Sequence, residues 1–434
     1  MDKEDAITIK ELTPVFEHRT SLLPEKELKS FVEYYFSRRD KYLGILKKSP
    51  PPAYILETSV LKEKAGHFKR VFQDALPDVG FYFAVKSNNY PDVSKVLIEC
   101  GFGLDVSSGP ELEMALGLGA RDIVFSGPGK TKEELTLAVM NSEKTVVLLD
   151  SFGELERLEK AAALNNSIVR AGVRLTTNPE GLWRKFGIVL GDLLNFWEDA
   201  GKCPHIQLTG LQFHSSWNMN PDAQIDFIKK LGRVLAGMPD NFRQAVRFID
   251  IGGGYWPQQG EWLQKSGTPE GILKKALGKE ERSAKDHFMV PARPIRYFAE
   301  HLGMAISRHI LSVVDCRICL EPGRWICNDA MHILISVIDK KVPDLVVTDA
   351  GTNSIGWERF ETDYFPVLNL TRPSLKEIPC DILGSLCTPH DVWGYSYWGE
   401  DIQNGDILMI PMQGAYTYSL RQNFIKPLPG VVVI

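Results

Sequence analysis

One lysine of the 434-residue sequence stands where it could act as a nucleophile. Lys86 directly follows the apolar run FYFAV (81–85), so its amine is expected at the boundary between a buried strand and an open site. Desolvation at such a boundary lowers the pKa of a lysine amine and lets it form an imine with a carbonyl compound. A lysine at a strand end is more often a solvated surface residue, and Lys86 by itself leaves both interpretations open.

A glycine-rich turn and a carboxylate–arginine pair could together hold a ring that carries a phosphate. In DIGGGYW (250–256), three glycines let the backbone approach a ligand and direct N–H groups at a phosphate. In CLEPGR (319–324), Arg324 suits a phosphate and Glu321 suits a protonated ring nitrogen. His214, in LQFHSSWN, could stack on a flat ring. The alternatives are a tight turn without function, a structural ion pair and a core histidine.

Short apolar strands alternate with amphipathic stretches of helical length through the first three quarters of the chain. This pattern is typical of βαβ units and a parallel sheet. Eight strands over roughly 250 residues predict an α/β fold, a closed (β/α)8 TIM-like barrel, with an open doubly wound sheet as the alternative. Barrel strands end at one mouth, so Lys86, His214 and Glu321 would converge there. The expected strands are 81–85, 104–108, 123–127, 145–150, 169–175, 208–214, 247–252 and 316–323.

The chain is expected to divide into three parts. Residues 1–52 form a charged, helix-prone N-terminal segment associated with the second domain, residues 53–330 form the barrel, and residues 331–434 form a mostly antiparallel β domain. Residues 256–300 are an irregular insertion between the seventh and eighth barrel strands. The expected strands of the β domain lie within 332–340, 344–351, 364–370, 380–387 and 405–416.

Composition and charge argue against several classes of protein. A net charge of -5 and a pI near 6.0 give no electrostatic reason to expect nucleic acid or a membrane surface as a partner. The first residues lack the apolar core of a signal peptide, and no apolar run approaches the roughly 20 residues that span a bilayer, so a cytoplasmic protein is expected. Seven scattered cysteines suggest no disulfide framework, and no ligand cluster suggests a metal. The pair Cys316 and Cys319 is interpreted as strand packing.

Ten motifs that follow one another in order resemble a single enzyme family. From about residue 50 to the C-terminus, the chain is similar to the ornithine/diaminopimelate/arginine decarboxylases, which have the alanine-racemase-like fold (fold type III) and use pyridoxal 5'-phosphate (PLP). The resemblance implies removal of an amino acid's α-carboxylate as CO2, and a head-to-tail homodimer with shared active sites. The motifs are AVKSNN, LDVSSGPEL, VFSGPGKTKEEL, RKFGI, FHSSWN, DIGGGY, EPGR, DAGTN, LCTPHD and GAYTYS.

The resemblance also implies roles for individual residues. Lys86 would carry PLP as an imine, His214 would stack on its ring, and Glu321 would pair with its pyridine nitrogen. Cys387 would come from the partner subunit and return a proton to the substrate carbon after CO2 leaves. The phosphate would be held by Gly252, Gly253, Gly254, Arg324 and Tyr416, with Ser215 or Ser216 in place of a family serine, and Asp105, Glu111 and Arg174 would line the mouth around the cofactor.

Departures from the family bear on the substrate. Members that act on free diamino acids have an acidic residue after the cysteine, whereas this chain has Thr388, which cannot neutralise an ammonium group. Arg359 stands after DAGTN and could bind a distal carboxylate, as in the diaminopimelate branch, or could be a surface arginine. Asp391, just beyond the cysteine, is a further candidate for substrate contact. Trp217 stands where the family usually has the phosphate-binding serine.

These features favour a decarboxylase whose small-molecule amino-acid substrate has a distal carboxylate or a conjugated side chain. The CTP-x-D wording around Cys387 resembles members of siderophore and antibiotic pathways. One alternative is an ornithine or lysine decarboxylase of polyamine synthesis. Another is an amino-acid racemase on the same fold, which would use a tyrosine base in place of Cys387. A catalytically silent homologue would be expected to have lost Lys86 or Cys387.

Overall fold

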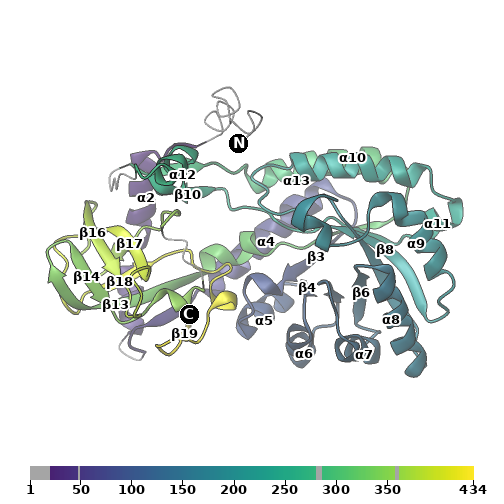
Figure 1. Ribbon diagram of the computed structural model, residues 1–434, viewed down its shortest axis with the longest axis horizontal. Coiled ribbons are helices and arrows are strands. Elements are labelled where there is room, and N and C mark those ends of the chain that lie inside the picture. Colours follow the sequence, from purple (N-terminus) through teal and green to yellow (C-terminus); the bar gives the residue numbers. More distant parts are fainter. Residues whose placement is uncertain (1–19, 47–48, 280–285, 357–360) are drawn as a thin grey trace, which may run out of the picture.

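A closed barrel of eight parallel strands forms the larger part of the protein in this computed structural model, which describes residues 20–46, 49–279, 286–356 and 361–434 (Figure 1). Each barrel strand overlaps one of the eight strands expected from the sequence, so the (β/α)8 prediction is confirmed. The strands are β3 (Val79–Ala84), β4 (Gly103–Val106), β5 (Ile123–Phe125), β6 (Thr145–Leu149), β7 (Val169–Leu175), β8 (Ile206–Phe213), β9 (Phe248–Asp250) and β12 (Arg317–Leu320).

Helices cover the outside of the barrel because each has one apolar face. In α4 (Thr58–Ala75), the buried residues Leu61, Ala65 and Phe68 recur every three or four positions, which places them on one side of the helix. No helix in the described parts of the chain is long and apolar enough to cross a membrane. The other covering helices are α5 (Pro91–Glu99), α6 (Gly109–Gly117), α7 (Lys132–Met140), α8 (Phe152–Leu164), α9 (Leu193–Ala200), α10 (Asp222–Ala236), α11 (Asp240–Ala245) and α13 (Ile295–His309).

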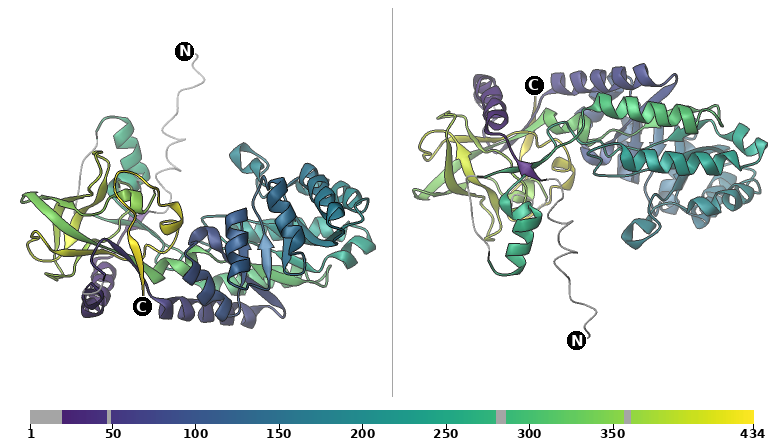
Figure 2. Two further views of the ribbon diagram at one scale, coloured as in Figure 1. Left: turned by 90° about the horizontal axis from the view of Figure 1, so that it is seen from below. Right: turned by 90° about the horizontal axis from the view of Figure 1, so that it is seen from above.

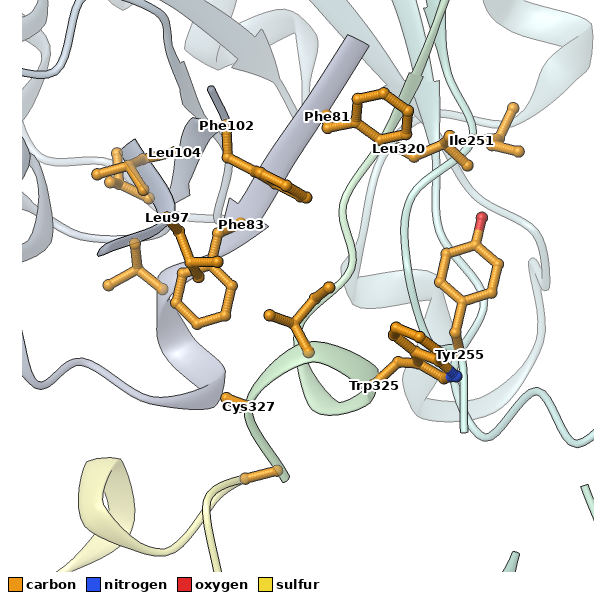
Figure 3. Close-up of a cluster of buried hydrophobic side chains, with 14 of the residues drawn as sticks. Phe81, Phe83, Leu97, Phe102, Leu104, Ile251, Tyr255, Leu320, Trp325 and Cys327 are labelled. Carbon is orange, nitrogen blue, oxygen red and sulfur yellow. The ribbon is translucent and has the colours of Figure 1, made fainter. Parts of the chain in front are cut away.

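The core between barrel and helices is rich in aromatic side chains (Figure 3). Phe81 and Phe83 lie on the outer face of β3, because alternate residues of a strand point to opposite sides. Phe81 packs edge-on against Phe68 of α4, with 6.0 Å between ring centroids. Tyr82, between them, points into the barrel, where it belongs to a small apolar cluster with Val124, Leu148, Cys319 and the partly buried Phe248.

The next inward layer, at the carboxyl ends of the strands, is polar. Asp105 on β4, Gln212 on β8 and Asp250 on β9 are all fully buried there. Each stands two positions beyond an inward residue of its own strand, and the same alternation brings Glu321 to the end of β12. The barrel therefore changes from an apolar filling to a polar floor one step below its mouth.

A second sheet of eight strands forms the β domain. Antiparallel pairs outnumber parallel ones, as expected, and an additional pairing of β14 with β13 closes six of the strands into a ring. The strand order is β14 (Leu345–Thr348), β16 (Glu377–Leu383), β17 (Val392–Trp398), β15 (Leu368–Asn369), β18 (Ile407–Ile410), β13 (Met331–Val342), β2 (Ala53–Leu56) and β19 (Gly430–Val433).

Three strands of this sheet differ from the expectation. Residues 53–56 were assigned to the barrel, but they form β2, which pairs with β13 and β19. The strands β17 and β19 were not anticipated. A local pattern of apolar residues indicates a strand but not the sheet that the strand joins, because β2 is separated from its neighbours in the sheet by the whole barrel in sequence.

The N-terminal helices and the insertion both lie against the β domain (Figures 1 and 2). Buried side chains of α2 (Glu25–Phe36) and α3 (Arg39–Ile45), including Val32 and Tyr42, pack with Ile55 and Leu334 of the sheet. The insertion contributes helix α12 (Pro269–Ala276) and the strands β10 (Glu261–Leu263) and β11 (Phe288–Val290), and β11 also pairs with β1 (Ser21–Leu22).

Candidate active site

A cavity of about 650 Å³, counting the part open to solvent, lies at the mouth of the barrel. It is built from the ends of β3, β8, β9 and β12 together with one loop of the β domain. Of the residues expected in the site, Lys86, His214, Ser216, Gly254, Glu321, Arg324 and Tyr416 line this cavity, along with Ala84, Trp217, Trp256 and Gly323.

Lys86 lies in the short turn that follows β3 and extends into the cavity. Its Nζ is 3.0 Å from Oδ2 of Asp105, a fully buried carboxyl group at the end of β4. Burial alone would lower the pKa of Lys86, but the carboxyl groups of Asp105 and Glu321 outweigh burial and raise it above its usual value. The prediction of a lowered pKa is therefore wrong for the protein without a cofactor. The local sequence could not show this, because Asp105 and Glu321 come from other strands.

Glu321 is a buried carboxylate in the wall of the cavity. Gln212 Nε2 lies 3.4 Å from each of its carboxylate oxygens, and His214 Nδ1 lies 3.7 Å from Oε2. Burial raises the pKa of Glu321, but the positive charges of the Lys86 ammonium group and the Arg174 guanidinium group outweigh that effect and leave the pKa below its usual value. Glu321 is thus held as an anion although its side chain is almost entirely buried.

The glycine turn after β9 is shaped by close contact with neighbouring loops. Gly252 and Gly254 have φ angles of +69° and +80°, and a Cβ atom on Gly253 would lie 2.1 Å from the Glu321 carbonyl oxygen. The N–H of Gly252 donates to Asp250 Oδ1 at 2.8 Å, and that of Gly253 donates to His214 Nδ1 at 3.2 Å. Of the three glycines expected to hold a phosphate, only Gly254 lines the cavity.

His214 is a neutral ring in this setting. Its Nδ1 accepts a hydrogen bond from a backbone N–H, so that nitrogen carries no proton. Burial lowers the pKa of His214, which also favours the uncharged form. An uncharged, flat side chain at the cavity wall suits stacking against another ring.

Arg324 lies between two aromatic rings at the other end of the cavity. Its guanidinium carbon is 4.2 Å from the centroid of the Trp256 ring and 5.0 Å from that of Tyr416. Tyr416 is fixed by its N–H, which donates to the Ser87 carbonyl oxygen at 2.7 Å. This arrangement holds a guanidinium group in one orientation, as the binding of an anion requires. Trp256 was not among the predicted site residues, although it lies inside the DIGGGYW segment.

Trp217 stands where the resemblance predicts a serine. Its side chain makes its hydrogen bond to the insertion and not to the interior of the cavity. Its side chain is 54% exposed, and its indole N–H donates to Glu261 Oε1 of the insertion at 2.9 Å. Ser215 Oγ bonds to Asn218, whereas Ser216 lines the cavity. Of the two serines considered as substitutes, Ser216 therefore has the suitable position.

Glu111 and Arg174 support the mouth from outside the cavity lining. Glu111 Oε2 accepts a hydrogen bond from the Ser107 N–H at 2.7 Å, which braces the turn after β4. Burial raises the pKa of Glu111. The Arg174 guanidinium group lies over the Phe186 ring at 4.6 Å, at the base of the loop that follows β7. Neither residue is among those that line the Lys86 cavity, and their predicted place around the cofactor at the barrel mouth stays a prediction.

The loop between β16 and β17 carries the remaining candidates. Cys387 is exposed, and it is not among the residues that line the Lys86 cavity. Thr388 Oγ1 accepts a hydrogen bond from the His390 N–H at 3.4 Å. Arg359, the other substrate-binding candidate, lies outside the described residues.

Asp391 is a brace within this loop, which corrects the expectation that it contacts substrate. The residue is 2% exposed. Its Oδ1 accepts hydrogen bonds from the N–H and the hydroxyl of Thr352, at 2.6 and 3.0 Å, and its Oδ2 accepts one from the Leu386 N–H at 2.7 Å. Because these donors occupy both oxygens, Asp391 ties the DAGTN segment to the loop of Cys387.

The insertion contacts the same loop through a chain of charges. His390 Nδ1 lies 2.8 Å from Glu361 Oε1, and Lys275 Nζ of α12 lies 3.5 Å from Glu361 Oε2. The Gln264 N–H also donates to the Thr362 carbonyl oxygen at 2.8 Å. The 256–300 segment, whose role the sequence leaves open, therefore supports the β-domain loops from one side.

Two polar residues of the barrel floor, Gln212 and Asp250, were missed by the sequence analysis. Both point inward because they stand two positions before His214 and Gly252, at the ends of their strands. Strict alternation along β8 and β9 was the signal that would have identified them. Both also have a buried side-chain oxygen without a hydrogen-bond donor among the described residues, Oε1 in Gln212 and Oδ2 in Asp250.

Comparison with known proteins places this site in a defined context. Residues 62–328 match the family model described as "Pyridoxal-dependent decarboxylase, pyridoxal binding domain". Among curated proteins, the chain is 27% identical over 401 residues to a diaminopimelate decarboxylase from Aquifex aeolicus, covering 88% of this chain and 86% of that protein. It is 24% identical over 405 residues to an L-glutamyl-[BtrI acyl-carrier protein] decarboxylase from Niallia circulans, covering 87% and 86%.

The fold has a counterpart among solved structures. A diaminopimelate decarboxylase from M. jannaschi superposes with a TM-score of 0.76 at 21% identity, covering 90% of this chain and 88% of that one. At this level of identity the superposition speaks for the fold alone.

Proposed function

The chain belongs to the pyridoxal-dependent decarboxylase family and is thus a PLP-dependent carboxy-lyase; on that premise we propose that its substrate is an amino acid with a distal carboxylate or a conjugated side chain. The observation that best supports this substrate class is in the loop of Cys387, where neutral Thr388 follows the cysteine. No acidic side chain is therefore positioned directly beside Cys387 in sequence to bind a distal ammonium group.

The residues at the barrel mouth fit PLP. The cavity has an amine at Lys86, a buried anion at Glu321 and a guanidinium group at Arg324, as an aldehyde, a pyridine nitrogen and a phosphate would require. The glycine turn supports this fit. A Cβ atom on Gly254 would lie 2.2 Å from the Ser215 carbonyl oxygen, so a larger residue would force the cavity wall to shift. When bound, PLP supplies an electron sink for the electron pair that CO2 leaves behind.

Each of these side chains has a defined task in the proposal. Lys86 would hold the cofactor covalently through Nζ until the substrate amine displaces its nitrogen. Glu321 would keep the pyridine nitrogen protonated by its negative charge, and neutral His214 would pack against the ring. Arg324 would bind the phosphate, and the hydroxyl of Tyr416 and the N–H of Gly254 would be further donors.

The proton that replaces CO2 is assigned to Cys387 of a second copy of the chain. The support is its position, because the thiol is exposed on a β-domain loop and does not line the Lys86 cavity of its own chain. A homodimer in which each loop enters the other cavity would also exclude water from the reacting carbon. Mixing Lys86→Ala chains with Cys387→Ala chains tests this assignment, since random re-pairing should restore about a quarter of the wild-type activity. Mixtures that remain as inactive as the separate variants would contradict it.

The class of substrate is tested by measuring CO2 release. We expect kcat/KM for meso-diaminopimelate or a glutamyl conjugate on a carrier protein to exceed that for ornithine and lysine by about 10²-fold, the usual value of a charge-assisted contact in a closed site. The relatives named above act, by their names, on diaminopimelate and on a carrier-linked glutamyl group, which supports this choice. Efficient turnover of free ornithine or lysine would contradict the proposal and favour a role in polyamine synthesis.

Thr388→Glu provides a matched variant for that assay. The introduced carboxylate restores an acidic neighbour of Cys387, so the ratio of kcat/KM for lysine to that for diaminopimelate should rise by about tenfold. Thr388→Gln has nearly the same size without the charge and should leave the ratio unchanged.

A further inference from the structure

Asp250 is a buried acid that the proposed mechanism does not use. It ends β9 with its side chain on the barrel floor, and it is fully buried. Its Oδ1 accepts one hydrogen bond, from the N–H of Gly252 at 2.8 Å. Its Oδ2 is buried and has no donor among the described residues. A buried carboxylate oxygen without a donor is costly, whereas the oxygen of a protonated acid can itself donate.

The charges on the barrel floor do not favour three anions. Asp105, Asp250 and Glu321 are all buried there, and the ammonium group of Lys86 lies 3.0 Å from Asp105. Like charges that share a site out of water cannot all persist, so at least one of these acids takes up a proton.

The hydrogen bonds of the three acids indicate which one is protonated. Asp105 has Lys86 and the Ser126 hydroxyl as donors, and Glu321 has Gln212 beside both oxygens. Asp250 has a single backbone donor. Burial and the neighbouring Glu321 carboxylate accordingly raise the pKa of Asp250 well above its usual value, whereas the pKa of Glu321 lies below its own.

We propose that Asp250 is a positioning residue, which stays protonated and donates a hydrogen bond to Glu321, so that Glu321 remains an anion aimed at the cavity. This role rests on the proposed function, in which Glu321 faces the pyridine nitrogen of PLP. The proton stays on Asp250 throughout, and no bond is made or broken there.

This assignment predicts opposite outcomes for two nearly identical substitutions. Asparagine at 250 keeps a carbonyl oxygen for the Gly252 N–H and an amide N–H for Glu321, so Asp250→Asn should leave kcat and the Kd for PLP within about threefold of wild type. Glu321→Gln removes the anion itself and should lower kcat by about 10²-fold or more. Asp250→Leu removes the donor and should shift the pH dependence of the bound PLP absorbance.

Infrared spectroscopy tests the proton directly and does not depend on activity. Holoenzyme labelled with carboxyl-13C aspartate should show the carbonyl band of a protonated aspartic acid, and that band should vanish in Asp250→Asn. This measurement decides the question even when Asp250→Leu fails to fold. Absence of the band, or an Asp250→Asn variant as impaired as Glu321→Gln, would overturn the proposal for Asp250. A harmless Glu321→Gln would instead overturn the proposed role of Glu321.

Discussion

At the barrel mouth, Lys86 and Glu321 are held by side chains from several strands, whereas Cys387 stands exposed on a loop between β16 and β17. Residues of a single chain are enough to fix the charges and the geometry around Lys86 and Glu321. The loop of Cys387 has its backbone braced, by Asp391, but its reactive atom faces solvent. Under the proposed function, this difference is a division of labour: the barrel residues bind and activate, and the β-domain loop delivers Cys387 to the site of a second copy of the chain.

The largest effect is expected at the barrel mouth. Lys86→Ala removes the only covalent attachment proposed for PLP, so CO2 release should fall by about 10⁴-fold or more. The absorbance of the protein-bound cofactor should change with it. Lys202→Ala, in the exposed turn that follows α9, is the matched control and should have no effect. A Lys86→Ala enzyme that keeps both activity and absorbance would contradict the assignment.

A smaller effect, of a different kind, is expected at the exposed loop of Cys387. Cys387→Ala should lower the rate of product formation by about 10²- to 10³-fold, because it removes a proton donor. It should leave PLP affinity and absorbance unchanged, since the thiol does not line the cavity of its own chain. Cys203→Ala serves as the control thiol. If Cys387→Ala weakens PLP binding as Lys86→Ala does, the barrel mouth and the loop of Cys387 do not have separate roles.

Removing the brace of the exposed loop should cost stability first and activity second. Asp391→Ala leaves the buried N–H of Thr352 and the partly buried N–H of Leu386 without an acceptor, which should lower the free energy of unfolding by about 2 kcal/mol. Denaturant unfolding measures this change. Activity should fall with PLP absorbance intact. A variant as stable as wild type would show that the loop does not depend on this carboxylate.

The smallest effect is expected where the insertion touches the loop. Lys275→Ala removes one half-exposed ion pair with Glu361, worth less than about 1 kcal/mol, so kcat should change by no more than about threefold. The change should shrink further as ionic strength rises, because salt screens such pairs. Lys274→Ala, one position away on α12, is a control for the helix. A tenfold loss in Lys275→Ala would mean that the insertion has a larger role in placing Cys387.

The sequence predicted the barrel well because its strands are short, apolar and evenly spaced, and each of the eight was found at the expected place. The same spacing placed Lys86, His214 and Glu321 at strand ends, and in the structure these residues line one cavity. It did not predict the raised pKa of Lys86, which depends on Asp105 and Glu321 from strands far away in sequence. Nor did it show that Asp391 is buried beneath its loop, because burial of a single aspartate leaves no local pattern.

The position of β2 in the second sheet has a consequence for how the protein is made. The ribosome synthesises β2 before the entire barrel, but its partners β13 and β19 emerge only after it. At typical rates of translation, this apolar strand waits for on the order of tens of seconds without its neighbours. Its four residues are all buried in the finished sheet, so the nascent chain exposes a segment prone to aggregation during that interval. The barrel can form during synthesis, whereas the β domain has to close after the last strand leaves the ribosome.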